Sequence, residues 1–293
     1  MSASVQAARL LAFALITLGH CVLVTACLRR FNRSRLRDFD EYAYFAVLFA
    51  FGSTQSVLHL LALTVGIGYW SGLAAFGAID AILAVWLLRT RRCSAGMPPR
   101  GGHGALALGD LPRLVIPGVV AVVALSLQWY SVTAVSLRVA GTDAAHYHVP
   151  HAVNFAHGAN LFGFVATPHL YPMGTSIWAA WLLQPLPGPA LLDLTTFPST
   201  LLLLVSIGLL FRAAIGESGV LWAPWLTLWI LSAPLVRLSL LPSADMFYTA
   251  AFLAVFVQCF IIWRSRTVRS MDLWGFGVAS GLLLSTKTTG FPS

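Results

Sequence analysis

The sequence predicts an all-α fold, a polytopic transmembrane helical bundle of about eight spans with two short juxtamembrane helices in an external loop. Three observations predict it. Hydrophobic residues make up 58% of the chain and charged residues only 10%, whereas a soluble domain carries about 25% charged residues. The apolar runs are continuous and close to the ~20 residues that a helix needs to cross the hydrocarbon core. The arginines gather in the short segments between these runs.

The spans are expected to be helices because lipid offers no partner for backbone polar groups, which leaves helices and closed β-barrels. Barrel strands alternate in polarity, and these runs do not. The expected spans lie at about residues 8–28, 42–64, 70–88, 114–135, 191–212, 220–240, 245–263 and 273–290.

The arginines predict the orientation of the spans. The clusters at 29–37 and 89–113, together with Arg212 and the cluster at 264–269, all fall on one side of the membrane if there are eight spans and the N-terminus is external. Basic residues mark the cytoplasmic side. The net charge of +8 therefore indicates membrane topology, and we expect no nucleic acid partner. A signal peptide carries its positive charge before its apolar core, but here the arginine cluster at 29–37 follows the first apolar run. This order indicates an uncleaved first span.

Two short helices are expected in the external loop between the fourth and fifth spans. Residues 174–184 are apolar, but this run of eleven is too short to span and is bracketed by prolines, which predicts a helix lying in the membrane interface. A second short helix is expected to open at Pro150 and to close near Gly158.

Composition divides the chain into two parts. Residues 93–112 are rich in Gly, Pro and Arg and predict a flexible cytoplasmic linker. A three-helix N-terminal membrane leader (1–92) precedes it, and residues 113–293 follow. Three of the four cysteines fall in expected spans and one in a cytoplasmic segment, so we expect free thiols.

The external loop at 138–173 is rich in groups that carry chemistry. Asp143 lies just past the end of a span, and five of the eight histidines are in the loop: His146, His148, His151, His157 and His169. Asp143 could cap a helix end, and the histidines could be interfacial residues with a wet tip. A metal site formed by the first three histidines is a further alternative, although the intervening proline fixes no tetrahedral geometry.

Three more ionisable residues stand in or beside expected spans. Asp245 begins the seventh span, where it could simply complement the helix dipole. Lys287, the single lysine of the chain, lies near the external end of the last span, where it could snorkel to the interface. Asp80 lies in the middle of the third span and has no cationic partner in its own helix. Ionisable groups inside spans are costly and mark candidate functional sites.

Topology brings Asp143, Asp245 and Lys287 to one membrane face. Two carboxylates and an ammonium there suit a reaction at the lipid surface, because a carboxylate can act as a base and an ammonium can neutralise a phosphate. The segments concerned are Thr142 to Pro150 (TDAAHYHVP), His169 to Gly174 (HLYPMG), Ser243 to Phe252 (SADMFYTAAF) and Gly281 to Gly290 (GLLLSTKTTG).

In the order and spacing of these segments, the chain from about 113 to 293 resembles the GT-C superfamily of membrane glycosyltransferases, such as protein O-mannosyltransferases and lipid A aminoarabinose transferases. The resemblance implies that Asp143 is the catalytic acidic residue, Asp245 the second acidic residue and Lys287 the lysine that contacts the carrier phosphate. His146, Tyr147 and His148 are expected to line the site. Whether a divalent cation takes part stays open, and the cofactor is otherwise unknown.

The resemblance also implies partners and a location. The donor is a sugar on a polyprenyl phosphate, and the acceptor is a glycan, a lipid or a protein. The protein is expected in a bacterial inner or plasma membrane, with the active site on the external face. Residues 113–293 would be the N-terminal part of a transferase module that continues in relatives, so that the chain as given would lack part of the carrier groove and be inactive alone. A membrane transporter and a non-catalytic membrane subunit are the rival functions.

Overall fold

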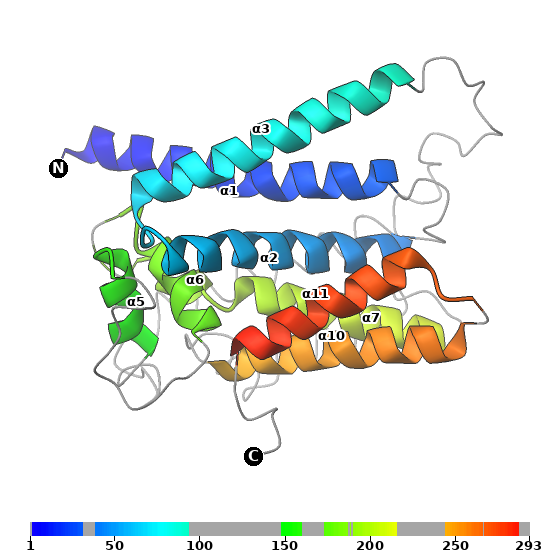
Figure 1. Cartoon of the computed structure of the whole chain (residues 1–293). Coiled ribbons are helices and arrows are strands. Elements are labelled where there is room, and N and C mark those ends of the chain that lie inside the picture. The colour runs from blue at the N-terminus through cyan, green and yellow to red at the C-terminus, as the bar shows by residue number, and fades with distance from the viewer. Residues whose placement is uncertain are drawn as a thin grey trace.

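The computed structural model of the chain is all-helical wherever it is described (Figure 1). The described residues are 2–31, 39–93, 148–159, 173–186, 188, 190–215, 244–265 and 267–286. They form helices α1 (Ala3–Phe31), α2 (Phe39–Leu63), α3 (Tyr69–Cys93), α5 (Val149–Ala156), α6 (Gly174–Leu182), α7 (Phe197–Ile215), α10 (Ala244–Arg264) and α11 (Ser270–Thr286), with a 3₁₀ turn, η5, at Leu192–Leu194.

Five of these helices, α1, α2, α3, α7 and α10, are long and apolar enough to cross a membrane. The shortest of the five apolar segments, in α7, has 18 residues and is therefore about 27 Å long at ~1.5 Å per residue, close to the ~30 Å of a hydrocarbon core. The chain is thus an integral membrane protein. The cysteines Cys21, Cys27 and Cys259 carry free thiols, as predicted.

The five helices coincide with the predicted spans at 8–28, 42–64, 70–88, 191–212 and 245–263. One boundary was wrong, because α7 begins at Phe197 and η5 precedes it. Pro198 stands in the first turn of α7, where its missing N–H costs no helical hydrogen bond. The last predicted span corresponds to α11, which has 17 described residues. The spans at 114–135 and 220–240 lie outside the described residues, so the count of eight stays a prediction.

Both short helices predicted in the external loop are present. Pro150 lies in the first turn of α5, and Gly158 follows its end with a φ of 90°, a left-handed conformation that glycine adopts without strain. All nine residues of α6 are buried, and its predicted position at the membrane interface stays a prediction. Neighbouring helices enclose its two tryptophans.

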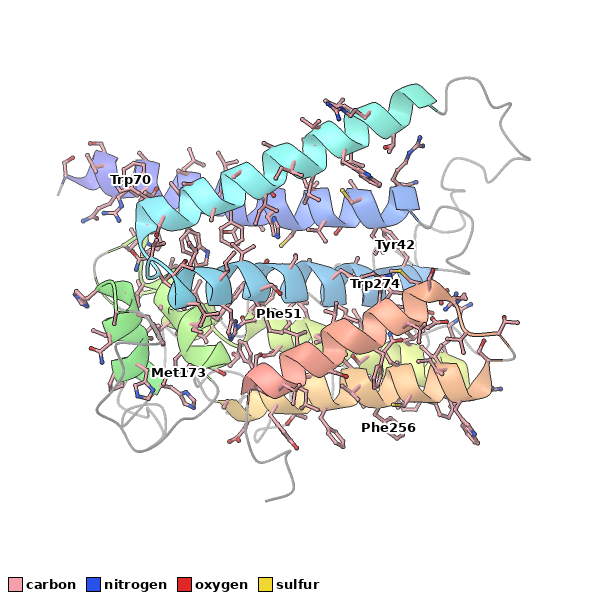
Figure 2. All side chains as sticks on the ribbon, viewed as in Figure 1. Tyr42, Phe51, Trp70, Met173, Phe256 and Trp274 are labelled. Atoms are coloured by element: carbon pink, nitrogen blue, oxygen red, sulfur yellow. The ribbon has the colours of Figure 1, made fainter. Side chains whose placement is uncertain are left out.

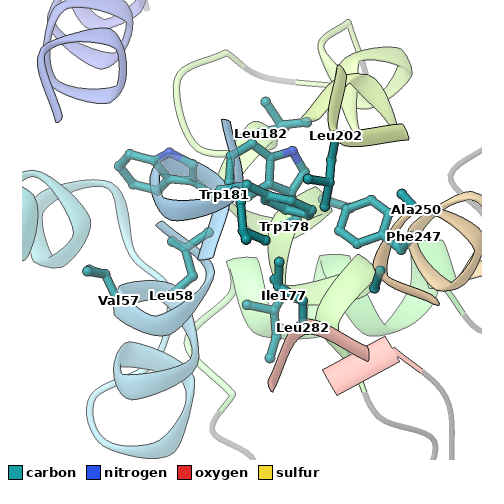
Figure 3. Close-up of a cluster of buried hydrophobic side chains, with 14 of the residues drawn as sticks. Val57, Leu58, Ile177, Trp178, Trp181, Leu182, Leu202, Phe247, Ala250 and Leu282 are labelled. Carbon is teal, nitrogen blue, oxygen red and sulfur yellow. The ribbon is translucent and has the colours of Figure 1, made fainter. Parts of the chain in front are cut away.

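The core of the bundle is built around α6 (Figure 3). Ile177, Trp178 and Trp181 of α6 are at most 7% exposed. The side chains around them come from helices far apart in the sequence, and include Leu58 of α2, Leu202 of α7, Phe247 of α10 and Leu282 of α11. Burial of these large side chains supplies the packing energy that fixes the end of the bundle where α5 and α6 lie.

Helix α2 connects the leader to the later helices. Its Phe51 ring lies 5.3 Å from the Phe247 ring of α10 and 5.9 Å from the Trp178 ring of α6, measured between centroids. Tyr44 of α2 donates a hydrogen bond to the carbonyl of Ala254 in α10 at 3.1 Å. In contrast, Trp70, Phe256 and Trp274 project from α3, α10 and α11 (Figure 2) and are 49% to 76% exposed, as suits side chains that face lipid.

The described arginines of the predicted clusters gather at one end of the bundle. Arg29 and Arg30 close α1, Arg212 closes α7 and Arg264 closes α10, while Arg269 directly precedes α11. Figure 1 shows these helix ends on the side away from α5 and α6. Helix directions therefore agree with the alternation predicted from the arginine clusters, and the assignment of this end to the cytoplasm stays a prediction.

Acidic side chains pair with two of these arginines. Arg212 Nη1 lies 3.0 Å from Asp40 Oδ2, and Arg269 Nη2 lies 2.7 Å from Asp272 Oδ1 and also contacts Glu41. The hydrogen bond to Asp272, followed by the contacts with Glu41, raises the pKa of Arg269 against the opposing effect of burial. These pairs join the start of α2 to the end of α7 and the start of α11.

Candidate functional site

The end of the bundle opposite the arginines brings several helix termini together. Helices α2 and α11 finish there, α7 and α10 begin there, and α5 and α6 lie there as short caps (Figure 1). This arrangement follows from the alternating direction of the long helices. It places the described parts of the predicted loop, of the Asp245 segment and of the Lys287 segment on one side of the molecule.

His148 and Ser176 connect α5 to α6. His148 Nδ1 lies 3.2 Å from Ser176 Oγ, and both residues are at most 5% exposed. His151, one turn further along α5, is also buried, and burial lowers the pKa of its imidazole. His148 and His151 are thus held inside the protein. The alternative, in which the loop histidines lie at the membrane interface with their ring nitrogens in water, does not describe these two residues.

The start of α6 lies against both α2 and α11. Gln55 Nε2 of α2 donates a hydrogen bond to the Gly174 carbonyl at 2.8 Å. A Cβ atom at Gly174 would lie 2.7 Å from the backbone oxygen of Ser285 in the last turn of α11. This close approach needs a glycine, because a methyl group there would overlap the backbone of α11. The residue just before Lys287, Thr286, is 2% exposed.

Three polar atoms beside this junction are buried and have no hydrogen-bond partner among the residues that the structure describes. They are Gln55 Oε1, Thr175 Oγ1 and Trp178 Nε1. His59, one turn beyond Gln55 in α2, contacts Gln55 Nε2 through its Nδ1 at 3.3 Å. Sequence reasoning missed Gln55, His59 and Thr175, although a glutamine and a histidine four residues apart inside an apolar span were a visible signal. Unsatisfied buried polar atoms are rare in proteins and are often found at functional sites.

Asp245 lies in the first turn of α10 and is partly buried. There a carboxylate complements the positive end of the helix dipole. This position is compatible with a purely structural role of Asp245 and with a role in the site. The predicted role of Asp245 as the second acidic residue of the site stays a prediction, and so does the predicted role of His148 in lining it. Asp143, His146, Tyr147 and Lys287 lie outside the described residues. Within the described part of the chain, no three His, Cys, Asp or Glu side chains form a group that could hold a metal ion.

A second polar cluster lies inside the leader and gives Asp80 a partner. His20 Nδ1 of α1 lies 2.7 Å from Asp80 Oδ1 of α3, and His20 Nε2 lies 3.0 Å from Ser53 Oγ of α2. His20 is 1% exposed and the Asp80 side chain 11% exposed. Asp80 therefore pairs with a neighbouring helix, which the pattern of its own helix could not indicate.

Comparison with known proteins adds no relative. No family model matches the chain, and neither a curated protein nor a solved structure matches it.

Proposed function

We propose that the chain is a membrane glycosyltransferase of the GT-C kind, which moves a sugar from a polyprenyl-phosphate-linked donor to an acceptor on the external face of the membrane. The observation that supports the proposal is the junction at the start of α6. There the end of α11, which leads directly into Lys287, packs on Gly174, and Ser176 two residues later contacts His148 of the predicted acceptor loop.

The proposed reaction inverts the sugar at its anomeric carbon. An acceptor oxygen or nitrogen forms a bond to that carbon while the bond from the carbon to the phosphate oxygen breaks, and the polyprenyl phosphate leaves. Asp143 takes the proton of the acceptor, and Lys287 stabilises the negative charge on the departing phosphate. Asp245 positions the acceptor or helps to hold a divalent cation, and His146, Tyr147 and His148 line the acceptor side.

The test follows a radioactive sugar in membranes that contain the chain. The donors are polyprenyl phosphates carrying tritiated mannose or tritiated aminoarabinose, and label leaving the lipid phase for water-soluble or protein fractions is counted. D143N and K287A are each expected to lower the rate by about 10²-fold or more, the scale of a general base or of a charge-stabilising group. D110N, in the predicted linker, is the matched control and keeps the full rate.

Transfer that is equally fast in D143N, K287A and control membranes would refute the transferase proposal, whereas no transfer from either donor is the result expected of a chain that lacks part of the carrier groove. Repeating the assay in EDTA separates two forms of it, because only a metal-assisted reaction stops when divalent cations are removed.

A transporter is the second candidate, and the His20–Asp80 pair is the observation that favours it. Transporters hold coupling ions at the middle of the bilayer, often on paired ionisable side chains. Proteoliposomes filled with a pH-sensitive dye distinguish the two functions. An imposed pH gradient that decays faster with the chain than with its D80N variant supports transport, and equal rates of decay contradict proton transport through this pair.

A further inference from the structure

The leader contacts α6 at three places along the helix. At the start of α6, a side chain of α2 donates a hydrogen bond to the carbonyl of the first helical residue. In the middle, the Trp181 ring contacts the Phe13 ring of α1 and the Phe76 ring of α3. Just beyond the end of α6, Gln184 contacts both α1 and the turn that joins α2 to α3. This third place is polar and lies where the beginning of α1 and the beginning of α3 approach α6 (Figure 1).

Arg9 of α1 binds the chain just beyond the C-terminal end of α6. Its Nη2 donates a hydrogen bond to the backbone carbonyl of Gln184 at 2.8 Å, two residues after Leu182, the last residue of α6. The final carbonyls of a helix have no partner inside the helix and carry a partial negative charge, so a guanidinium beside them is stabilising. This contact therefore attaches α1 to the end of α6.

Tyr69, the first residue of α3, fixes the position of Arg9. The Tyr69 hydroxyl donates a hydrogen bond to the Arg9 carbonyl at 2.9 Å. The guanidinium carbon of Arg9 also lies 4.2 Å from the centroid of the Tyr69 ring. A cation over an aromatic face is attracted by the ring, and more strongly where water is excluded. Because Tyr69 is only 5% exposed, the guanidinium rests on a buried ring.

The side chain of Gln184 joins the end of α5 to the leader. Its Nε2 donates to the carbonyl of Ile67, in the turn between α2 and α3, at 2.8 Å. The same nitrogen donates to the carbonyl of Ala156, the last residue of α5, at 3.2 Å. Both partners are carbonyls, which can only accept, so the amide nitrogen and not the amide oxygen must face them. Gln184 thus connects the ends of α5 and α6 with the leader.

The backbone of the leader also approaches the chain just after α5. A Cβ atom at Gly66, in the turn between α2 and α3, would lie 2.9 Å from the carbonyl oxygen of Gly158. Gly66 has a φ of 83°, which an L side chain adopts only with strain. Glycine therefore allows this turn to touch the end of α5.

Neither α5 nor α6 is long enough to be stable without such contacts. They have eight and nine residues, whereas isolated helices shorter than ~12 residues are marginal even with favourable sequences. Their order therefore depends on the parts of the chain that hold their ends. The hydrogen bonds described above supply this support from the leader.

We propose that Arg9, Tyr69 and Gln184 form a latch, through which the leader holds α5 and α6 in place. The three side chains are positioning residues, because they determine where α5 carries His148 and where α6 carries Ser176. A latch also accounts for an arginine on the predicted external side, where the positive-inside rule disfavours one. The inference does not rest on the transferase proposal, since it concerns only how the two short helices are held.

The first test is hydrogen exchange of the full chain in detergent micelles, followed by mass spectrometry of its peptides. R9M removes the guanidinium and keeps an apolar side chain of similar length. We expect the amides of α5 and α6 to exchange about 10- to 100-fold faster in R9M, which is the effect of losing a hydrogen bond to a charged group. The amides of α10 are expected to keep the rate of the parent protein. R264M, at an exposed position, is the matched control and should leave α5 and α6 unchanged.

Two results of this experiment would overturn the proposal. Equal exchange of α5 and α6 in R9M and in the parent protein would show that Arg9 does not hold them. An equal acceleration in α10 would show that Arg9 stabilises the whole bundle and not the two short helices. Y69F keeps the test decisive if R9M does not fold, because it removes one neutral hydrogen bond and retains the ring. It should accelerate α5 and α6 by about two- to tenfold, and no acceleration would contradict the role of Tyr69.

The second test asks whether the latch positions His148. Diethyl pyrocarbonate modifies imidazole nitrogens that reach water, and His148 is 5% exposed whereas His20 of the leader is 1% exposed. We expect His148 to be modified about tenfold faster or more in R9M than in the parent protein, because opening of α5 and α6 exposes it. The rate at His20 should not change. Equal rates at His148 in the two proteins, or the same increase at His20, would contradict the proposal.

Discussion

A methyl group added at Gly72 of α3 tests how the leader is attached to the α5–α6 end of the bundle. A Cβ there would lie 2.1 Å from Cζ3 of Trp181 in α6. Carbon atoms pack best at about 3.5 Å or more, so the indole must move by roughly 1.4 Å. Trp181 has no room for this shift, because it is fully buried and its ring lies 4.8 Å from that of Phe13 and 5.4 Å from that of Phe76.

The control for this overlap is the same substitution one and a half turns later. A Cβ at Gly77 meets no atom within 4 Å, and both glycines lie in α3. Replacing glycine by alanine favours each helix by up to about 1 kcal/mol, and overpacking at Gly72 opposes this gain by about 1–3 kcal/mol. We therefore expect G72A to be less stable than G77A by about 1–3 kcal/mol.

Unfolding of the two variants by denaturing detergent in mixed micelles, followed by tryptophan fluorescence, measures this difference. The chain has ten tryptophans, so the emission reports unfolding of the whole protein and not of Trp181 alone. Equal unfolding midpoints for G72A and G77A would refute the packing of α3 on α6 that the close approach of Gly72 to Trp181 implies.

Two further variants test the contacts at the two ends of the bundle. R269Q leaves the carboxylates of Glu41 and Asp272, 6% and 0% exposed, without their arginine, and is expected to cost about 3 kcal/mol at pH 7. In the parent protein these contacts raise the pKa of Arg269, so its stabilisation is complete at any pH below the unfolded-state pKa and is constant from about pH 6 to 9. R264Q, at an exposed position, should change stability by under about 0.5 kcal/mol, and equal effects of the two variants would contradict the assignment. At the other end, a double-mutant cycle of H148A and S176A should give a coupling energy of about 0.5–1.5 kcal/mol, and a coupling of zero would show that the bond between α5 and α6 does not form.

The sequence by itself determined the membrane class and the direction of the long helices. Apolar runs of spanning length have few alternatives in lipid, so α1, α2, α3, α7 and α10 were predictable. The arginine clusters then predicted the end at which each helix finishes, because basic residues are retained on one side. Pro150 and Gly158 likewise predicted α5 through their local backbone preferences.

The tertiary structure decided which polar groups meet. Nothing in the pattern of α3 alone could pair Asp80 with His20, because the partner stands 60 residues away. The junction of Gln55, Gly174 and Ser285 likewise joins three helices far apart in the chain. The burial of α6 could not be predicted for the same reason, since length and hydropathy describe how a helix meets lipid, whereas its burial results from packing against neighbours that no single segment encodes.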